Sequence, residues 1–306
     1  DDFQARIPPS LMSMSFLEQL TIDGNRWPFK DGGLSELPDN MFSFFPHLKE
    51  LTLGQLALKK CPSSMALLVN IVTLNMSETK FVEPCDVSMV SKWQKLRTLK
   101  VHASATENFM KALKTLPALE EVDVWNNRVL KSIPVEMFEN KPMLKKFGFH
   151  NMTRIKYPQA LPDLPNIKSA DWGVPSKEDG SQDLSNLTTL THLSYFGCTL
   201  HYCPKGLGLL TSLTEVRLFN VNDIRPSGDG DTVLGAGWIG GMKSLKSFEV
   251  RNSNMTLISE EIGRCTDLED LSIEGNKLLL ALPSGLQQCH KLNSLDVSGC
   301  AVLAGT

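Results

Sequence analysis

The chain has 306 residues, of which 42% are hydrophobic and 21% are charged, and these proportions exclude a wholly disordered protein. Its 31 lysines and arginines stand against 34 aspartates and glutamates, so it lacks the basic surplus typical of nucleic-acid-binding proteins, and we expect no nucleic-acid partner. No apolar run approaches the roughly 20 residues that a membrane-spanning helix needs, so we expect no membrane insertion by this segment.

One pattern of apolar residues recurs along the whole chain. In a clear copy, Leu119, Val122 and Val124 occupy positions 1, 4 and 6, and Asn127 follows at position 9. Positions 4 and 6 are apolar between polar neighbours, which predicts a short strand with one buried face. In chain order, twelve copies begin at Leu17, Leu48, Ile71, Leu96, Leu119, Leu144, Ile167, Leu190, Leu213, Leu245, Leu268 and Leu292.

The second half of many copies predicts a short helical turn. A proline often stands there, as at Pro38, Pro134 and Pro283, and proline favours the start of a helical or 3₁₀ segment. Residues 107–116 have the strongest helical pattern, and shorter turns are expected at residues 260–265 and 284–289. Two insertions, at residues 26–34 and 223–241, interrupt the regular spacing.

This spacing resembles the signature L-x-x-L-x-L-x-x-N/C-x-L of the leucine-rich repeat family, over essentially the whole chain. The resemblance implies an α/β solenoid of horseshoe type with about 12 repeats. A parallel sheet would line its concave face, and short helices or 3₁₀ turns would line its convex face. We expect residues 1–306 to form a single leucine-rich repeat domain that is a fragment of a longer chain, because neither end carries a polar capping element.

Position 9 of the family pattern holds an asparagine that bonds to backbone groups of neighbouring turns. Asn25, Asn127 and Asn276 keep this residue. Small side chains that can take over part of the role stand at Thr79, Ser104, Cys198, Ser253 and Cys300. Leu56, Met152, Pro175 and Val221 cannot take it over.

The nucleophilic, acidic and metal-binding residue types do not converge on one place in the repeat pattern. We therefore expect no enzymatic activity, no cofactor and no metal site. Cys198, His201 and Cys203 are as close in sequence as the ligands of many zinc sites. Their positions in the repeat pattern, however, point their side chains in different directions. The cysteine pairs of neighbouring turns, which could bridge or remain buried thiols, are Cys61 with Cys85 and Cys265 with Cys289. Four sequons offer glycosylation sites if the chain is secreted, at Asn75, Asn151, Asn186 and Asn254. An extracellular and a cytoplasmic location both stay open.

Position 7 of each copy points out of the predicted sheet, and its middle stretch carries large aromatic residues. Exposed aromatic residues beside arginine dominate the energetics of many protein interfaces. The candidate protein-binding residues are therefore His102, Trp125, His150, Phe196 and Phe219, together with Arg217 and Arg251. Position 5 adds a flank of mixed charge, formed by Lys100, Asp123, Asp171, Arg217 and Glu249.

These features predict a non-enzymatic protein-interaction module. The family resemblance implies that it binds a protein or peptide on its concave face, as the repeat part of a receptor or scaffold protein. Two alternatives are a targeting domain for an enzyme, such as a ligase or kinase, whose catalytic part lies outside this chain, and a structural spacer within an assembly.

Overall fold

The computed structural model describes residues 7–24, 34–54, 56–77, 79–83, 85–102, 105–127, 130–150, 152, 155–158, 160–172, 183–196, 206–220, 233–234, 237–253 and 255–300. Contacts between Cα atoms divide the chain into two compact units, Asp1–Phe149 and His150–Thr306. A single domain over residues 1–306 stays a prediction.

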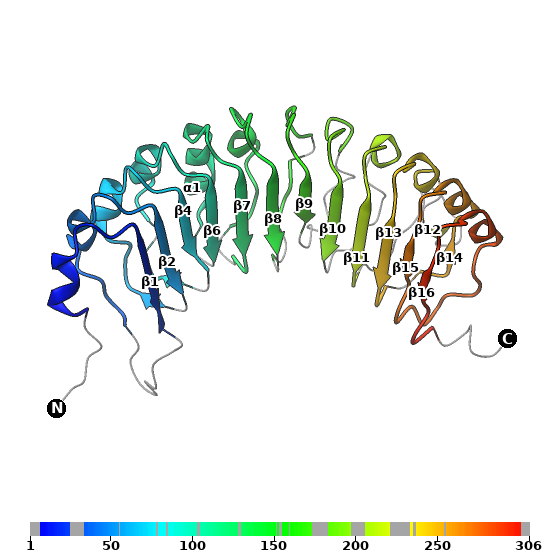
Figure 1. Cartoon of the computed structure of the whole chain (residues 1–306), viewed down its shortest axis with the longest axis horizontal. Coiled ribbons are helices and arrows are strands. Elements are labelled where there is room, and N and C mark those ends of the chain that lie inside the picture. Colours follow the sequence, from blue (N-terminus) through cyan, green and yellow to red (C-terminus); the bar gives the residue numbers. More distant parts are fainter. Residues whose placement is uncertain are drawn as a thin grey trace. The chain divides into compact units, whose positions relative to one another are not determined.

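Twelve parallel strands follow one another in chain order, and Figure 1 labels them. Up to the unit boundary they are β1 (Gln19–Asp23), β2 (Glu50–Gly54), β4 (Thr73–Met76), β6 (Thr98–His102), β7 (Glu121–Trp125) and β8 (Lys146–His150). The second unit has β9 (Ser169–Trp172), β10 (His192–Phe196), β11 (Glu215–Phe219), β13 (Ser247–Arg251), β15 (Asp270–Ser272) and β16 (Ser294–Asp296). Each strand lies at the predicted place in its repeat, so the twelve predicted strands are confirmed.

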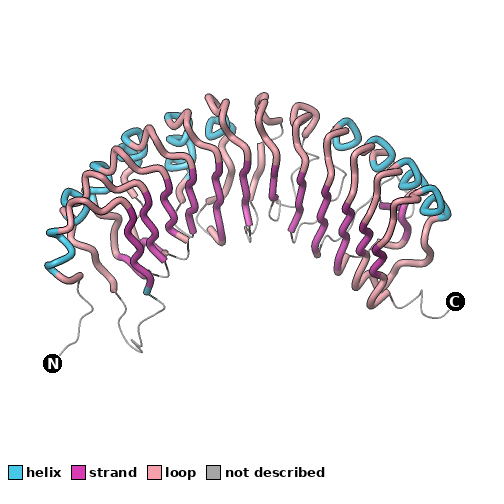
Figure 2. The backbone as a smooth tube through the Cα atoms, viewed as in Figure 1, coloured by secondary structure: helices cyan, strands magenta, loops and turns pink. Residues whose placement is uncertain are grey.

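Short helical turns lie on the side of each unit opposite the strands, as Figure 2 shows in cyan and magenta. In the first unit they are η1 (Pro9–Ser13), η3 (Met41–Phe44), η4 (Ser63–Leu67), η5 (Val87–Lys92), α1 (Glu107–Ala112), η6 (Leu113–Thr115) and η7 (Val135–Phe138). In the second they are η8 (Leu207–Leu209), η9 (Ile239–Gly241), η10 (Glu260–Arg264) and η11 (Ser284–Gln288). Within the described ranges α1 is the one α-helix, which confirms the prediction for residues 107–116.

The starts of these turns follow from local chemistry. Pro62, Pro134 and Pro283 precede η4, η7 and η11 in an extended conformation, which proline's fixed φ favours. At α1, the Thr106 side chain accepts a hydrogen bond from the Phe109 N–H group, and at η5 Asp86 accepts one from Ser88. Such caps satisfy backbone donors that have no partner within the turn.

The core of each unit is built from positions 1, 4 and 6 of the repeats. Trp172 and Tyr195 point inward, as the frame predicts, and the small Ala170 stands beside Trp172 in the same strand. The Trp172 ring packs edge-on against Tyr157, with 4.9 Å between the ring centroids. In neighbouring strands the register keeps equivalent positions opposite each other, so that Leu193 lies beside Ala170 and Val216.

Position 9 supplies hydrogen bonds between neighbouring repeats. The buried Thr79 hydroxyl donates to the Leu53 carbonyl at 2.7 Å, and the Cys300 thiol donates to the Ile273 carbonyl at 3.2 Å. The predicted small substitutes therefore make the bond at these two positions. Leu56 and Met152 are simply buried as apolar residues.

Two short strand pairs were not predicted. β3 (Ala57–Leu58) pairs with β5 (Lys80–Phe81), and β12 (Val233–Leu234) pairs with β14 (Leu257–Ile258). The second pairing shows where the long ninth repeat gains its length, because β12 and β14 occupy equivalent places in their repeats. The extra residues of this repeat stand in the sequence between β11 and β12. Most residues of the two predicted insertions, 26–34 and 223–241, lie outside the described part of the chain. No helix in the described part of the chain is long and apolar enough to cross a bilayer.

Lys141, near η7, is an unexpected buried cation with only 4% of its surface exposed. Its ammonium group donates to the Glu139 carbonyl at 3.1 Å, and burial lowers the pKa of Lys141 to about 8. A lysine whose pKa falls on folding destabilises the folded state below that pKa, and the penalty disappears as pH rises toward the unfolded value. Lys141→Met should therefore raise the free energy of unfolding by about 1–3 kcal/mol at pH 7.

Urea unfolding at pH 7 and pH 10 measures this effect. The gain from Lys141→Met should shrink at pH 10, because the unmodified chain becomes more stable there. Lys114→Met, at an exposed position in η6, is the control and should change stability by less than about 0.5 kcal/mol at either pH. A gain of equal size at both pH values would contradict this explanation.

Candidate functional site

The outward face of the second unit arranges polar and aromatic residues in rows that cross the strands. Parallel register places Ser194, Arg217, Glu249, Ser272 and Asp296 in one row. The adjacent row contains Phe196, Phe219 and Arg251. The predicted alignment of positions 5 and 7 is thus confirmed for these strands.

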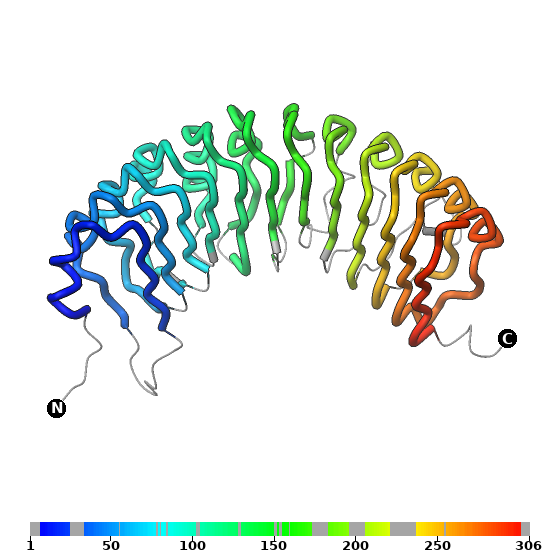
Figure 3. The backbone as a smooth tube through the Cα atoms, viewed as in Figure 1, coloured from blue at the N-terminus to red at the C-terminus, as the bar shows by residue number. Residues whose placement is uncertain are grey.

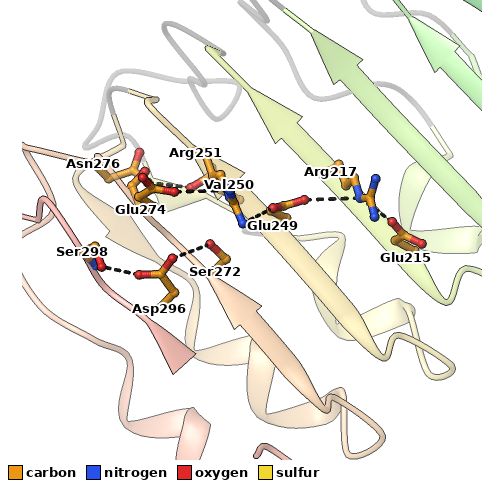
Figure 4. A network of polar contacts seen from close by, with 10 residues as sticks. All are labelled: Glu215, Arg217, Glu249, Val250, Arg251, Ser272, Glu274, Asn276, Asp296 and Ser298. Carbon is orange, nitrogen blue, oxygen red and sulfur yellow. Dashed lines mark hydrogen bonds and ion pairs between the residues drawn. The ribbon is translucent and has the colours of Figure 1, made fainter. Parts of the chain in front are cut away.

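Five charged residues of β11, β13 and the turn after β15 form a continuous chain of ion pairs, which we call the arginine–glutamate ladder (Glu215, Arg217, Glu249, Arg251 and Glu274). Figure 4 shows it crossing the strands. Arg217 pairs with Glu215 on its own strand, and its Nε atom lies 3.3 Å from Glu249 Oε2. Arg251 pairs with Glu249 through Nη2, and its Nη1 atom lies 3.3 Å from Glu274 Oε2.

The ladder changes how Arg217 and Arg251 must be interpreted. Both guanidinium groups already have carboxylate partners within the chain, so part of their hydrogen-bonding capacity is used before any ligand binds. Ion pairs at a protein surface contribute little to stability, typically below about 1 kcal/mol each. Their effect here is to orient a defined pattern of charge beside Phe219.

The outward face becomes acidic toward β16. Asp270 is exposed, and the Asp296 carboxylate accepts a hydrogen bond from the Ser298 N–H group at 2.9 Å. The bonds from Ser298, assisted by the positive charge of Arg251 and by Ser272, lower the pKa of Asp296, so this carboxylate is ionised at neutral pH. Strands β11, β13, β15 and β16 and residue 274 together carry five carboxylates, which are Asp270, Asp296 and the three glutamates of the ladder, and two guanidinium groups.

The first unit carries a separate exposed aromatic residue. Trp125, at the end of β7, has 46% of its surface exposed, as the prediction for position 7 requires. Register places it directly opposite His102 of β6. At the opposite end of the same strand, Glu121 lies 3.7 Å from Lys100 and 3.8 Å from Lys146, so this part of the face is of mixed charge.

Several predicted residues are placed only in part. His102, His150 and Phe196 lie in the expected strands, but their side chains are outside the described part. Asn186 is exposed, and Asn75 is half-buried in β4, where its Oδ1 accepts from the Ser77 N–H group. The predicted glycosylation and zinc-like residues outside the described ranges are Asn151, Asn254, Cys198, His201 and Cys203, and the position-9 residues outside them are Asn25, Ser104, Pro175 and Val221. Glycosylation stays a prediction.

The cysteines that the structure describes are free and buried: Cys61, Cys85, Cys265, Cys289 and Cys300. The two pairs that could bridge therefore do not form disulfides here. Among the described residues, no group of three or more His, Cys, Asp or Glu side chains is arranged to hold a metal ion.

Comparison with solved structures decides the fold. The chain is similar to a leucine-rich repeat protein of Leptospira interrogans, with 21% identity and a TM-score of 0.64 over 96% of this chain and 81% of that one. It is also similar to a chain of the Drosophila Toll–Spatzle complex (16% identity, TM-score 0.66, 96% of this chain and 40% of that one). The plant peptide hormone receptor RGFR1, solved with RGF2, is a third likeness (18% identity, TM-score 0.52, 96% and 53%).

The chain folds as a leucine-rich repeat solenoid. No protein-family model and no curated protein sequence matches it, so these likenesses show the fold alone. Because the solenoid spans only about half of RGFR1 and less of the Toll-complex chain, their partners are not carried over as findings.

Glu215 and Glu274 of the ladder were missed as site residues. A signal for them exists, because charges of opposite sign stand at neighbouring outward positions of adjacent repeats. Such charges face each other in a parallel leucine-rich repeat sheet once the repeats are aligned. The successive colours of Figure 3 show these repeats lying side by side in chain order within the second unit.

Proposed function

We propose that this leucine-rich repeat solenoid is a non-enzymatic protein-recognition module that binds a protein or peptide on the outward face of its sheet. The observation that carries the proposal is the ordered surface of β11 to β16, in which Phe219 stands beside the arginine–glutamate ladder. The likeness to RGFR1 solved with RGF2, and to a chain of the Toll–Spatzle complex, supports a protein or peptide as the ligand.

The charge on this surface selects the chemistry of the partner. Both arginines have carboxylate partners within the chain, Glu274 among them, and Asp270 and Asp296 add two further carboxylates on β15 and β16. A partner that presents lysine or arginine side chains complements these carboxylates, and an apolar side chain of the same partner packs on Phe219. Electrostatic complementarity of this kind gives specificity and fast association.

The first unit offers Trp125 as an anchor of its own, and we propose that it binds a protein or peptide by aromatic contact. The predicted column consists of His102, Trp125, His150, Phe196, Phe219 and Arg251. The side chains of Trp125, Phe219 and Arg251 are described and support the proposal. An assignment as the repeat part of a receptor or scaffold belongs to this proposal.

Peptides selected from a random display library against the purified chain supply a test ligand. Phe219→Ala or Trp125→Ala should weaken binding by about 2 kcal/mol or more, roughly 30-fold in Kd, because aromatic anchors carry a large share of interface energy. The melting temperature should barely change, because both side chains point away from the core. Calorimetric titration measures the affinity, and selected peptides should be rich in lysine or arginine.

Leu209→Ala is the matched control, since Leu209 is exposed on η8, on the side opposite the strands. It should leave the affinity unchanged. If Leu209→Ala abolishes binding while both aromatic variants bind normally, the recognition surface lies on the helical side and the proposal is wrong.

A further inference from the structure

Two neighbouring repeats of the first unit carry the same short motif, Cys-x-x-x-Met. It occupies residues 61–65 and residues 85–89, 24 positions apart. In each copy the cysteine precedes a 3₁₀ turn and the methionine lies within it, in η4 and η5 respectively. Because these two turns pack against each other, the motif places two cysteines and two methionines in adjacent turns.

Cys61 stands at the centre of the sulfur contacts. Cys61 Sγ lies 3.3 Å from Met65 Sδ and 3.9 Å from Met89 Sδ. The Cys85 thiol is within hydrogen-bonding reach of Cys61, and this contact, with burial, raises the pKa of the Cys61 thiol. Both methionines are fully enclosed, whereas Cys61 and Cys85 keep 9% and 7% of their surfaces exposed. The two cysteines therefore lie nearer the surface than the methionines.

The other described cysteines behave differently. The thiols of Cys265, Cys289 and Cys300 each donate to a backbone carbonyl of the preceding repeat, at 3.2, 3.4 and 3.2 Å. In the described part of the chain, Cys61 has sulfur atoms as its hydrogen-bonding neighbours instead. Cysteines in neighbouring repeats therefore do not form a sulfur cluster by themselves. The cluster at Cys61 depends on the two methionines.

This spacing suits a metal ion with soft ligands. A tetrahedral ion with metal–sulfur bonds of about 2.3 Å separates its ligand atoms by about 3.8 Å, which is close to the 3.9 Å between Cys61 and Met89 and longer than the 3.3 Å between Cys61 and Met65. Thiolate and thioether sulfur together select Cu(I) over the harder divalent ions. The carboxylates of Asp39 and Asp86 act electrostatically on Cys61, and their negative field favours a cation.

We propose that Cys61, Cys85, Met65 and Met89 form a binding site for one Cu(I) ion. Binding replaces the two thiol protons, which pass to the solvent, and forms two copper–thiolate and two copper–thioether bonds. Copper stays in its monovalent state, so no oxidant or reductant takes part. The site lies on the helical side of the first unit and is independent of the proposed recognition surface.

Anaerobic titration of the whole chain with Cu(I), against a chromophoric Cu(I) chelator, measures affinity and stoichiometry. We expect one tightly bound equivalent, with X-ray absorption showing only sulfur neighbours at about 2.3 Å. The paired substitution C61S with C85S should weaken binding at least a hundredfold. The matched control, C265S with C289S, removes two buried thiols of the second unit and should leave the tight equivalent unchanged.

Met65→Leu and Met89→Leu keep volume and apolar character, so they remain informative if the serine variant fails to fold. Each should weaken binding at least tenfold. Ag(I), which mimics Cu(I) without redox chemistry, should bind with the same stoichiometry. Three results would overturn the proposal: no tight equivalent in the folded chain, binding unaffected by the methionine variants, or copper causing only a Cys61–Cys85 disulfide while Ag(I) fails to bind.

Discussion

Leu193→Ala should lower the free energy of unfolding by about 2–5 kcal/mol. Leu193 lies in β10 with 1% of its surface exposed, at position 4 of its repeat. In the neighbouring strand β9 the equivalent residue is already the small Ala170, and the adjacent Trp172 is rigidly packed. The space left by the lost side chain therefore cannot be filled by nearby groups, and a cavity adds to the lost burial.

Urea unfolding followed by circular dichroism measures this loss. Leu209→Ala is the control, because it makes the same chemical change at a leucine with 65% of its surface exposed, and it should cost less than about 0.5 kcal/mol. If Leu193→Ala costs as little as Leu209→Ala, the repeat frame does not describe the core of this copy.

Asn276→Ala should cost about 2–4 kcal/mol, because it leaves buried backbone groups without partners. The Asn276 side chain is completely buried and its Nδ2 donates to the Val250 and Ile273 carbonyls, both at 2.7 Å. Its Oδ1 accepts a hydrogen bond from the Ser253 N–H group at 3.1 Å. One side chain thus joins its own turn to the preceding repeat.

The same unfolding experiment tests this prediction, with Asn293→Ala as the exposed control. Asn293 makes only a long bond of 3.4 Å to the Lys291 carbonyl, so its loss should be nearly neutral. Asn276→Asp is a second informative variant, since it keeps the acceptor for Ser253 but loses both donors. A smaller loss for Asn276→Asp than for Asn276→Ala would show that the bonds to the carbonyls are not the main contribution.

The strands and their buried faces were predictable because one rule governs them. A side chain in a strand points to alternate faces, so Leu193 and Tyr195 had to share the inner face with Val216 of the next strand. The repeat length then fixed which strands are neighbours. The short pairs β3–β5 and β12–β14 were not predictable in this way, because two residues are too few to show an alternation.

The chemistry of the outward face was only partly predictable. Spacing placed Arg217 and Arg251 on the surface, but their pairing with Glu249 depends on side-chain conformations that no sequence pattern encodes. Similarly, Cys61 and Cys85 were recognisable as neighbours, whereas the approach of Met65 and Met89 depends on how the two turns pack. Local spacing predicts which face a residue occupies, and packing decides which atoms it meets.

The strict register of the ladder has a consequence for how such a protein diversifies. Residues 245–267 make up one complete repeat, so recombination that removes them joins two ends that already fit the same frame. Phe219, now opposite Arg251, would then face Glu274, and Arg217 would face Ser272 in place of Glu249. The gain or loss of one repeat thus changes the charge opposite Phe219 and Arg217 in one step, while the twelve-strand sheet keeps its frame at the cost of the β12–β14 pair.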